Sequence, residues 1–123
     1  MKNKIIENKL EQFFELCHGW NGKFSLAPPK NNIQLLSRIY DTITEWEHVN
    51  IEDVGVGDDG EVDLVWTIGD TRYYLTIHNS DTSEIEIITT KNKNISKEYT
   101  IDNHNYQVVL ISNALYSIIH DNE

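Results

Sequence analysis

The hydrophobic pattern begins with two helical stretches. Apolar residues recur every three or four positions over residues 3–17 and again over residues 31–47, the spacing of amphipathic helices. The first stripe consists of Ile6, Leu10, Phe13, Phe14 and Cys17, and the second of Ile33, Leu36, Ile39, Tyr40, Ile43 and Trp46. Gly19 is the residue expected to end the first helix. Residues 20–29, with their proline pair, predict a loop between the two helices.

After Asn50 the period changes from helical to alternating, which is typical of strands with one buried face. The alternation predicts strands over residues 54–56, 62–68, 72–77 and 84–87, and a short edge strand through Tyr99 and Ile101. Turns are predicted at residues 57–60, 69–70 and 78–83, and a loop at 91–94, from their glycine, asparagine, aspartate and serine content.

The last stretch, residues 106–120, predicts a closing helix. Its apolar face would consist of Val108, Ile111, Leu115, Ile118 and Ile119. The β-branched run at residues 106–112 leaves a strand open as the alternative.

Together these elements predict a single α+β domain over residues 1–123. Two N-terminal helices precede an antiparallel meander of about four to five strands, and a C-terminal helix follows. The helices are expected on one face of the sheet, and the alternating pattern leaves the other face to solvent.

The net charge of the chain limits the classes of molecule that it is expected to bind. The chain of 123 residues has a formal net charge of −10, which argues against direct binding to nucleic acid or to an anionic membrane. A basic protein partner is consistent with that charge, and so is a charge that serves only solubility. The chain has no apolar run of about 18 residues, and the single cysteine excludes an internal disulfide. These features favour a cytoplasmic protein.

The acidic residues are concentrated in one tract. Between Arg38 and Arg72 the chain has ten acidic residues and no lysine or arginine. The candidate partner-binding residues are Glu52, Asp53, Asp58, Asp59, Glu61 and Asp63. Such an asymmetry can steer a basic partner toward one face. The alternative is a solvated sheet edge that resists aggregation.

No motif predicts catalysis. The sequence lacks the phosphate-binding glycine loops, the nucleophile elbow and the zinc-protease motif. Cys17-His18 is the one adjacent Cys/His pair, and Cys17 is interpreted as a core cysteine because it lies on the apolar stripe. The histidines at 18, 48, 78, 104 and 120 have no metal-ligand spacing. The prediction is therefore no catalytic residue, no cofactor and no metal.

Two segments carry a resemblance. They are "GWNGKFSLAPPKNNIQLLSRIY" and "DDGEVDLVW" followed by "GDTRYYLTI". Together they resemble an uncharacterised class of small bacterial and phage proteins with a "GWDG…P" loop and helix and a "DGEvxLxW" hairpin. That class is associated with toxin–antitoxin systems or mobile elements. Asn21 stands where the class has aspartate. The resemblance covers roughly residues 18–78 and implies an antitoxin, immunity or anti-defence setting.

The function predicted first is a non-enzymatic module that inhibits a basic protein partner through its acidic face. A small hydrolase or metal-dependent enzyme assembled from distant residues remains open. So does an oligomeric accessory protein, for instance a homodimer formed through Tyr74 and Val65 on the exposed sheet face. Trp20, between two glycines, is predicted to pack across the gap between the first two helices and brace the fold.

Overall fold

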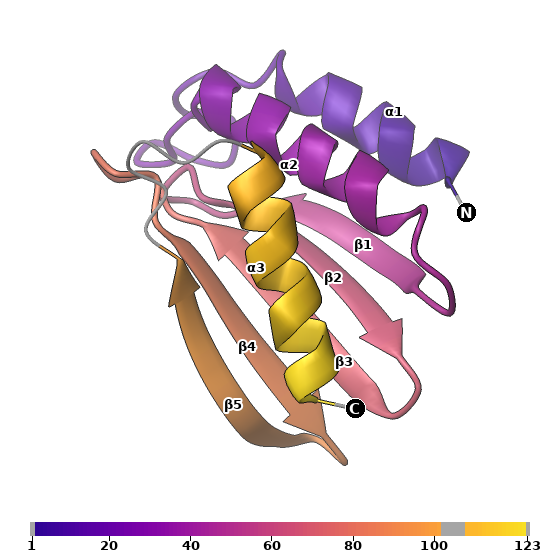
Figure 1. Cartoon of the computed structure of the whole chain (residues 1–123). Coiled ribbons are helices and arrows are strands. Elements are labelled where there is room, and N and C mark those ends of the chain that lie inside the picture. Colours follow the sequence, from indigo (N-terminus) through magenta and orange to yellow (C-terminus); the bar gives the residue numbers. More distant parts are fainter. Residues whose placement is uncertain (1, 102–107, 123) are drawn as a thin grey trace.

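The fold is α+β, with three helices on one face of a five-stranded antiparallel sheet (Figure 1). The computed structural model describes residues 2–101 and 108–122. The elements are α1 (Lys4–Phe13), α2 (Lys30–Ile43), β1 (Asn50–Val56), β2 (Val62–Ile68), β3 (Thr71–Ile77), β4 (Ile85–Lys91), β5 (Asn94–Ile101) and α3 (Val108–Asp121). The predicted class, element order and single-face helix packing are confirmed.

The sheet is a meander in which each strand pairs with the next along the chain, in the order β1-β2-β3-β4-β5. Gly69-Asp70 joins β2 to β3, and Ile68 pairs with Thr71 directly beyond it. The β4–β5 turn is equally short, and both of its residues, Asn92 and Lys93, have positive φ. Two successive left-handed residues match the right-handed twist of a hairpin. Two of the four strand pairs, β2–β3 and β4–β5, are therefore joined by tight two-residue turns.

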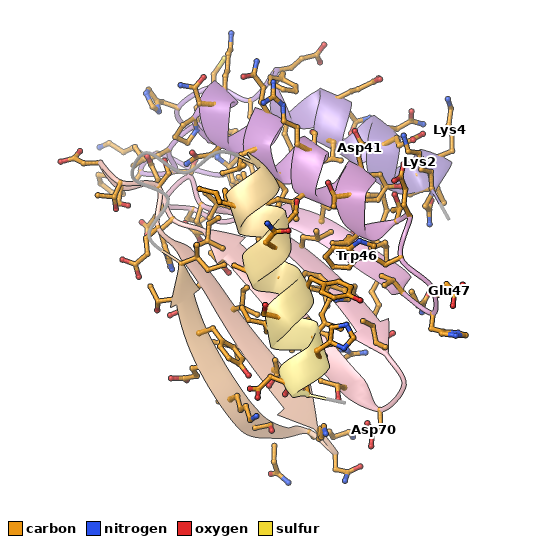
Figure 2. All side chains as sticks on the ribbon, viewed as in Figure 1. Lys2, Lys4, Asp41, Trp46, Glu47 and Asp70 are labelled. Atoms are coloured by element: carbon orange, nitrogen blue, oxygen red, sulfur yellow. The ribbon has the colours of Figure 1, made fainter. Side chains whose placement is uncertain are left out.

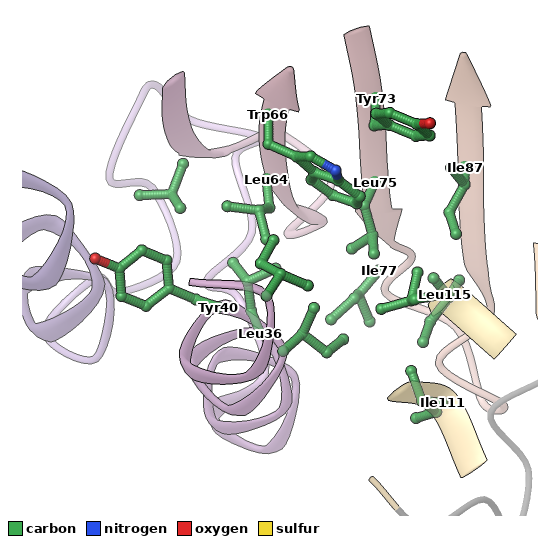
Figure 3. Close-up of a cluster of buried hydrophobic side chains, with 14 of the residues drawn as sticks. Leu36, Tyr40, Leu64, Trp66, Tyr73, Leu75, Ile77, Ile87, Ile111 and Leu115 are labelled. Carbon is green, nitrogen blue, oxygen red and sulfur yellow. The ribbon is translucent and has the colours of Figure 1, made fainter. Parts of the chain in front are cut away.

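The hydrophobic core lies between the sheet and the helices (Figure 3). Alternate residues of β2 and β3 point into it, among them Leu64, Trp66, Tyr73 and Leu75, each at most 2% exposed. Trp66 and Tyr73 are cross-strand partners whose rings stack 5.2 Å apart. The buried residues of the predicted helical stripes are Ile6, Leu10, Ile33, Leu36, Ile39, Tyr40, Ile43, Ile111, Leu115, Ile118 and Ile119. Phe13, Phe14 and Trp46 are only partly buried and pack against this core.

The first helix is shorter than predicted. It ends at Phe13, where the N–H of Phe14 bonds to the carbonyl of Glu11 and the N–H of Glu15 to the carbonyl of Gln12, so Gly19 is not its stop. Cys17 consequently falls outside the helical period and is exposed, and its interpretation as a core residue is wrong. Gly19 instead takes a φ of +86° inside the loop and donates its N–H to the carbonyl of Ser25 at 2.7 Å.

Other boundaries also differ from the prediction, since the strands predicted over 54–56 and 84–87 run over Asn50–Val56 and Ile85–Lys91. The helix predicted over 31–47 covers Lys30–Ile43, and the loop predicted at 91–94 shrinks to a two-residue turn. The edge strand β5 is correspondingly longer, running from Asn94 to Ile101. In the closing segment the described residues from Val108 are helical, and residues 106 and 107 and the side chain of Val108 lie outside the described part.

Candidate functional site

The turns between β1 and β2 (57–61) and between β3 and β4 (78–84) lie at the same end of the sheet, because Val62 pairs with Ile77 and Ile77 with Ile85. The loop before α2 is bonded to the first of these turns. Asn21 Nδ2 donates to Asp58 Oδ1 at 2.8 Å, and the Leu26 N–H donates to the Asp58 carbonyl at 2.8 Å. Three segments far apart in sequence therefore meet here (Figure 1).

Gly60 allows this close approach. Its φ is +83°, and a Cβ placed on it would lie 2.9 Å from the carbonyl oxygen of Ala27 and 2.8 Å from Asn79 Nδ2. Both the conformation and the space favour glycine. Asn79 Nδ2 in turn donates to the carbonyl of Asp59 at 2.9 Å. The 57–61 turn is thus bonded to both of its neighbours and is a fixed platform.

An open hollow of about 660 Å³ lies beside this platform on the sheet face opposite the helices. Its carboxylates come from Asp59, Glu61, Asp63 and Glu84, and its other lining residues are Thr76, His78, Asn79 and Ser80. Sequence reasoning found the first three but not Glu84, which lies outside the acidic tract and arrives through the meander. The sequence feature that could have located Glu84 is the predicted 78–83 turn, because a meander places alternate turns at the same end of the sheet.

Two glycines shape the acidic wall of the hollow. Gly55 pairs with Asp63 across the β1–β2 ladder, and a Cβ on Gly55 would lie 2.9 Å from Asp63 Oδ1. A Cβ on Gly57 would overlap the Glu61 carboxylate. The Asp63 and Glu61 side chains thus lie over bare backbone. The glycines of this stretch give the carboxylates room as well as forming a turn.

Asp63 is the most perturbed carboxyl of the hollow. Burial raises the pKa of Asp63, and the negative charges of Asp53 and Glu61 raise it further. Within residues 2–101 and 108–122, no lysine, arginine or histidine forms an ion pair with Asp63 or Glu61. A half-buried carboxylate without a cation is costly, because burial disfavours the charged form.

The other two predicted residues on β1 are already paired. Glu52 forms two contacts of 2.7 Å with the Arg72 guanidinium, and Asp53 accepts a hydrogen bond of 2.6 Å from Lys9 Nζ. The Lys9 hydrogen bond lowers the pKa of Asp53. The structure therefore brings Asp58, Asp59, Glu61 and Asp63 together around the turn. Glu52 and Asp53 already have cationic partners, although Asp53 is close enough for its charge to raise the pKa of Asp63.

In the described part of the chain, the cysteine and the histidines considered for catalysis or metal binding lie in different surroundings. The Nδ1 atom of His18 accepts the Ala27 N–H at 3.0 Å, while Cys17 Sγ lies 3.8 Å from the Glu15 carbonyl. His78 Nε2 lies 3.6 Å from Glu86 at the border of the hollow. Among the described residues no group of three or more His, Cys, Asp or Glu has an arrangement that could hold a metal ion. His104 lies outside the described part.

Trp20 has a different place from the one predicted. Its ring is half-buried, and Nε1 donates to the carbonyl of Leu26 at 2.7 Å. Trp20 is not one of the side chains packed against the hydrophobic core. It therefore closes its own loop instead of filling the gap between α1 and α2, while Phe24 in the same loop is 85% exposed.

Comparison of the chain with protein-family models, curated proteins and solved structures gives no match. No helix in the described ranges is both long and apolar enough to cross a lipid bilayer.

Proposed function

We propose that this chain is a non-enzymatic binding module that engages a basic protein through the acidic hollow. The binding face consists of the four carboxylates that line the hollow, Asp59, Glu61, Asp63 and Glu84, together with Asp58 on the same turn, and we call it the acidic face. The Asp58 carboxylate lies at its border and accepts a hydrogen bond from Asn21. The observation that carries the proposal is Asp63, a half-buried carboxylate with a raised pKa and no cationic partner among the described residues. Perturbed groups of this kind gather at functional sites.

A lysine or arginine supplied by a partner would lower the free-energy cost of the negative charge on Asp63. Its positive charge would favour the ionised form of Asp63 and offset the repulsion from Glu61. Binding would be fast and salt-dependent, because unpaired carboxylates steer a basic surface toward the hollow. Glu52 and Asp53 contribute less, since Arg72 and Lys9 already neutralise them.

An apolar anchor lies in the loop bonded to the acidic face. Phe24 is 85% exposed, with Lys23 Nζ 5.5 Å from the centre of its ring. Aromatic side chains dominate the energy of many interfaces when a partner buries them. The combination of a fixed acidic platform and an exposed ring suits an inhibitor that occupies a basic site. The resemblance to uncharacterised small proteins associated with toxin–antitoxin systems or mobile elements is the reason for proposing a cytoplasmic immunity or anti-defence role.

Matched variants test the proposal. Glu61→Gln/Asp63→Asn and Glu11→Gln/Glu15→Gln each remove two negative charges, the first from the acidic face and the second from the exposed surface around α1. An NMR titration with a lysine- and arginine-rich peptide is expected to shift residues 57–63 and 76–84, with an affinity that falls as salt rises. The first variant should lose this binding and the second should keep it. Equal loss in both variants would show that only net charge matters and would overturn the proposal.

The partner itself is then sought by affinity capture with the same two variants. The expected result is a basic protein that co-purifies with the wild type and with Glu11→Gln/Glu15→Gln but not with Glu61→Gln/Asp63→Asn. A partner retained equally by all three proteins would place its binding site outside the acidic face.

A second candidate is self-association through the outer sheet face. Val65 pairs with Tyr74, and Tyr74 with Ile88, so these side chains form a continuous apolar row across three strands. Tyr74 is 36% exposed. Sedimentation velocity of the wild type and of Tyr74→Lys tests it. A mass of twice the monomer that is lost in the variant would support a homodimer, and a monomer at all concentrations would exclude it.

A further inference from the structure

A second cavity lies at the opposite end of the sheet, on the side of the helices. It has a volume of about 360 Å³ and lies between the segment after α2 and the C-terminal half of α3. Its walls include Trp46, Glu47, Ile68, Tyr116, Ile119 and His120. We call this cavity the aromatic cleft. Its size falls within the range of small-molecule sites.

Two aromatic rings form a corner of the aromatic cleft. The ring centres of Trp46 and Tyr116 are 5.8 Å apart and their planes are inclined by 77°. Tyr116 is 53% exposed although it belongs to a helix that packs on the core, and Trp46 extends from the end of α2 toward α3 (Figure 2). The ring of His120 packs edge-to-face on Tyr116, with the ring centres 4.2 Å apart, so Tyr116 is held between two neighbours. The rings line the cleft together with Ile68 and Ile119, which add apolar surface.

The titratable side chains at the aromatic cleft, apart from Tyr116, are Glu47, His48 and His120. Glu47 supplies its only carboxylate, and no lysine or arginine lines it among the described residues. The Glu47 side chain is 92% exposed at the border of the cleft, and its Oε2 atom lies 3.9 Å from Nε2 of the exposed His48. The negative faces of aromatic rings attract cations, and most strongly those of tryptophan. A cation with an apolar envelope therefore matches both the rings and the carboxylate.

The segment that carries Trp46 and Glu47 is held by the backbone. The Trp46 N–H bonds to the carbonyl of Ile43 at 3.1 Å, continuing the last turn of α2. His48 then takes a φ of +65°, a left-handed conformation that turns the chain into β1. Because the border of the cleft is formed before any ligand arrives, little ordering entropy opposes binding.

We propose that the aromatic cleft binds a small quaternary ammonium compound, with the methylated nitrogen in the corner of Trp46 and Tyr116 and the charge facing Glu47. This site is separate from the acidic face and does not depend on the proposed protein partner. Neither the acidic tract nor any motif of the sequence indicated it, because its residues are drawn from the α2–β1 segment, β2 and α3.

The test compares choline with its neutral isostere, 3,3-dimethylbutan-1-ol. We expect choline to shift the indole N–H signal of Trp46 and the amides of residues 46–49 and 116–120 in NMR titrations, with millimolar affinity. The neutral alcohol should bind several-fold more weakly, since only the cation–π and carboxylate attractions differ. Equal binding of the two compounds would show a merely apolar cleft, and no shift with choline would show that the rings serve packing alone. Either result overturns the proposal.

Variants separate the rings from the carboxylate. Trp46→Leu is expected to abolish the choline shifts, and Glu47→Gln to weaken binding several-fold without affecting folding, because the Glu47 side chain is exposed. Trp20→Leu is the control for loss of a half-buried tryptophan away from the aromatic cleft, and it should bind choline as the wild type does. Because Trp46 packs against the core, a urea titration must show that Trp46→Leu is still folded. Unchanged binding by Glu47→Gln would remove the charge from the recognition and contradict the assignment.

Discussion

Asp63→Asn is expected to stabilise the protein at neutral pH. The substitution keeps the size and shape of the side chain and removes a half-buried negative charge that has no cationic partner in the described structure. Most substitutions lower stability. A gain would therefore identify Asp63 as a residue whose presence lowers the stability of the fold, which is frequent at binding sites.

The expected size follows from the neighbours of Asp63. Glu61 lies two residues earlier on the same chain, and Asp53 lies on β1, whose Gly55 is the direct cross-strand partner of Asp63. Like charges facing each other across a sheet each cost a few tenths of a kcal/mol. Together with partial burial, the gain in unfolding free energy should be about 0.5–1 kcal/mol. For a domain of this size that corresponds to a rise in Tm of roughly 2–5 °C.

The pH dependence gives a second, independent signature. Because the pKa of Asp63 is raised in the folded state, the folded protein holds this proton more tightly than the unfolded chain. Asp63 therefore lowers the free energy of unfolding by its full amount at pH values above its folded pKa. This destabilisation disappears as pH falls through the folded pKa to the unfolded value of 3.8. The advantage of Asp63→Asn should be largest at pH 7 and vanish below about pH 4.

Urea unfolding of both proteins between pH 4 and pH 7 measures this difference. Asp81→Asn is the matched control, because Asp81 is an exposed aspartate of the adjacent turn and its removal changes the same charge without burial. If Asp63→Asn destabilises the protein at pH 7, or if Asp81→Asn gives the same gain, the reasoning about Asp63 is refuted.

Three further substitutions test neighbouring contacts. Trp20→Ala should cost only about 1–2 kcal/mol of unfolding free energy in urea titrations, because it removes one hydrogen bond and half-buried area; a loss above about 3 kcal/mol would indicate a core role. Gly57→Ala should displace the Glu61 carboxylate and weaken partner binding at unchanged net charge, as measured by the same peptide titration. The Lys9 hydrogen bond lowers the folded pKa of Asp53, so the stability from this pair is lost as pH falls through that pKa. Lys9→Met should remove this contribution, so acid unfolding followed by circular dichroism should depend less steeply on pH. An acid-unfolding curve identical to that of the wild type would contradict the prediction.

The sequence predicted the sheet best because its alternation is local information. Leu64 and Trp66 of β2 and Tyr73 and Leu75 of β3 occupy apolar positions of the alternating pattern, and all four are buried. The first helix was predicted too long because Cys17 fits a helical period by spacing alone, whereas the chain leaves the helix after Phe13. Hydrophobic periodicity identifies the residues on one face of a helix only as far as that helix extends.

The candidate sites show the same division. The acidic tract located Asp58, Asp59, Glu61 and Asp63, which are close in sequence and also in space. Glu84 and His78 are far from the acidic tract in sequence, and only the return of the chain through β3 places their turn beside it. They were therefore missed, although the predicted meander and its 78–83 turn contained that information. The sequence could not show that Glu52 and Asp53 are paired, since Arg72 and Lys9 reach them from another strand and from α1.

The meander has a consequence for how the protein acquires its fold. Every strand pairs only with its neighbour in sequence, and the β2–β3 and β4–β5 turns have two residues each. Short loops cost little closure entropy, and proteins dominated by local contacts fold faster than those that need distant pairings. The sheet can therefore form hairpin by hairpin as the chain emerges from the ribosome. Docking of α1 and α2 must wait for β1 and β2, which follow them in the chain, so their apolar stripes are the last surfaces of the N-terminal half to be covered.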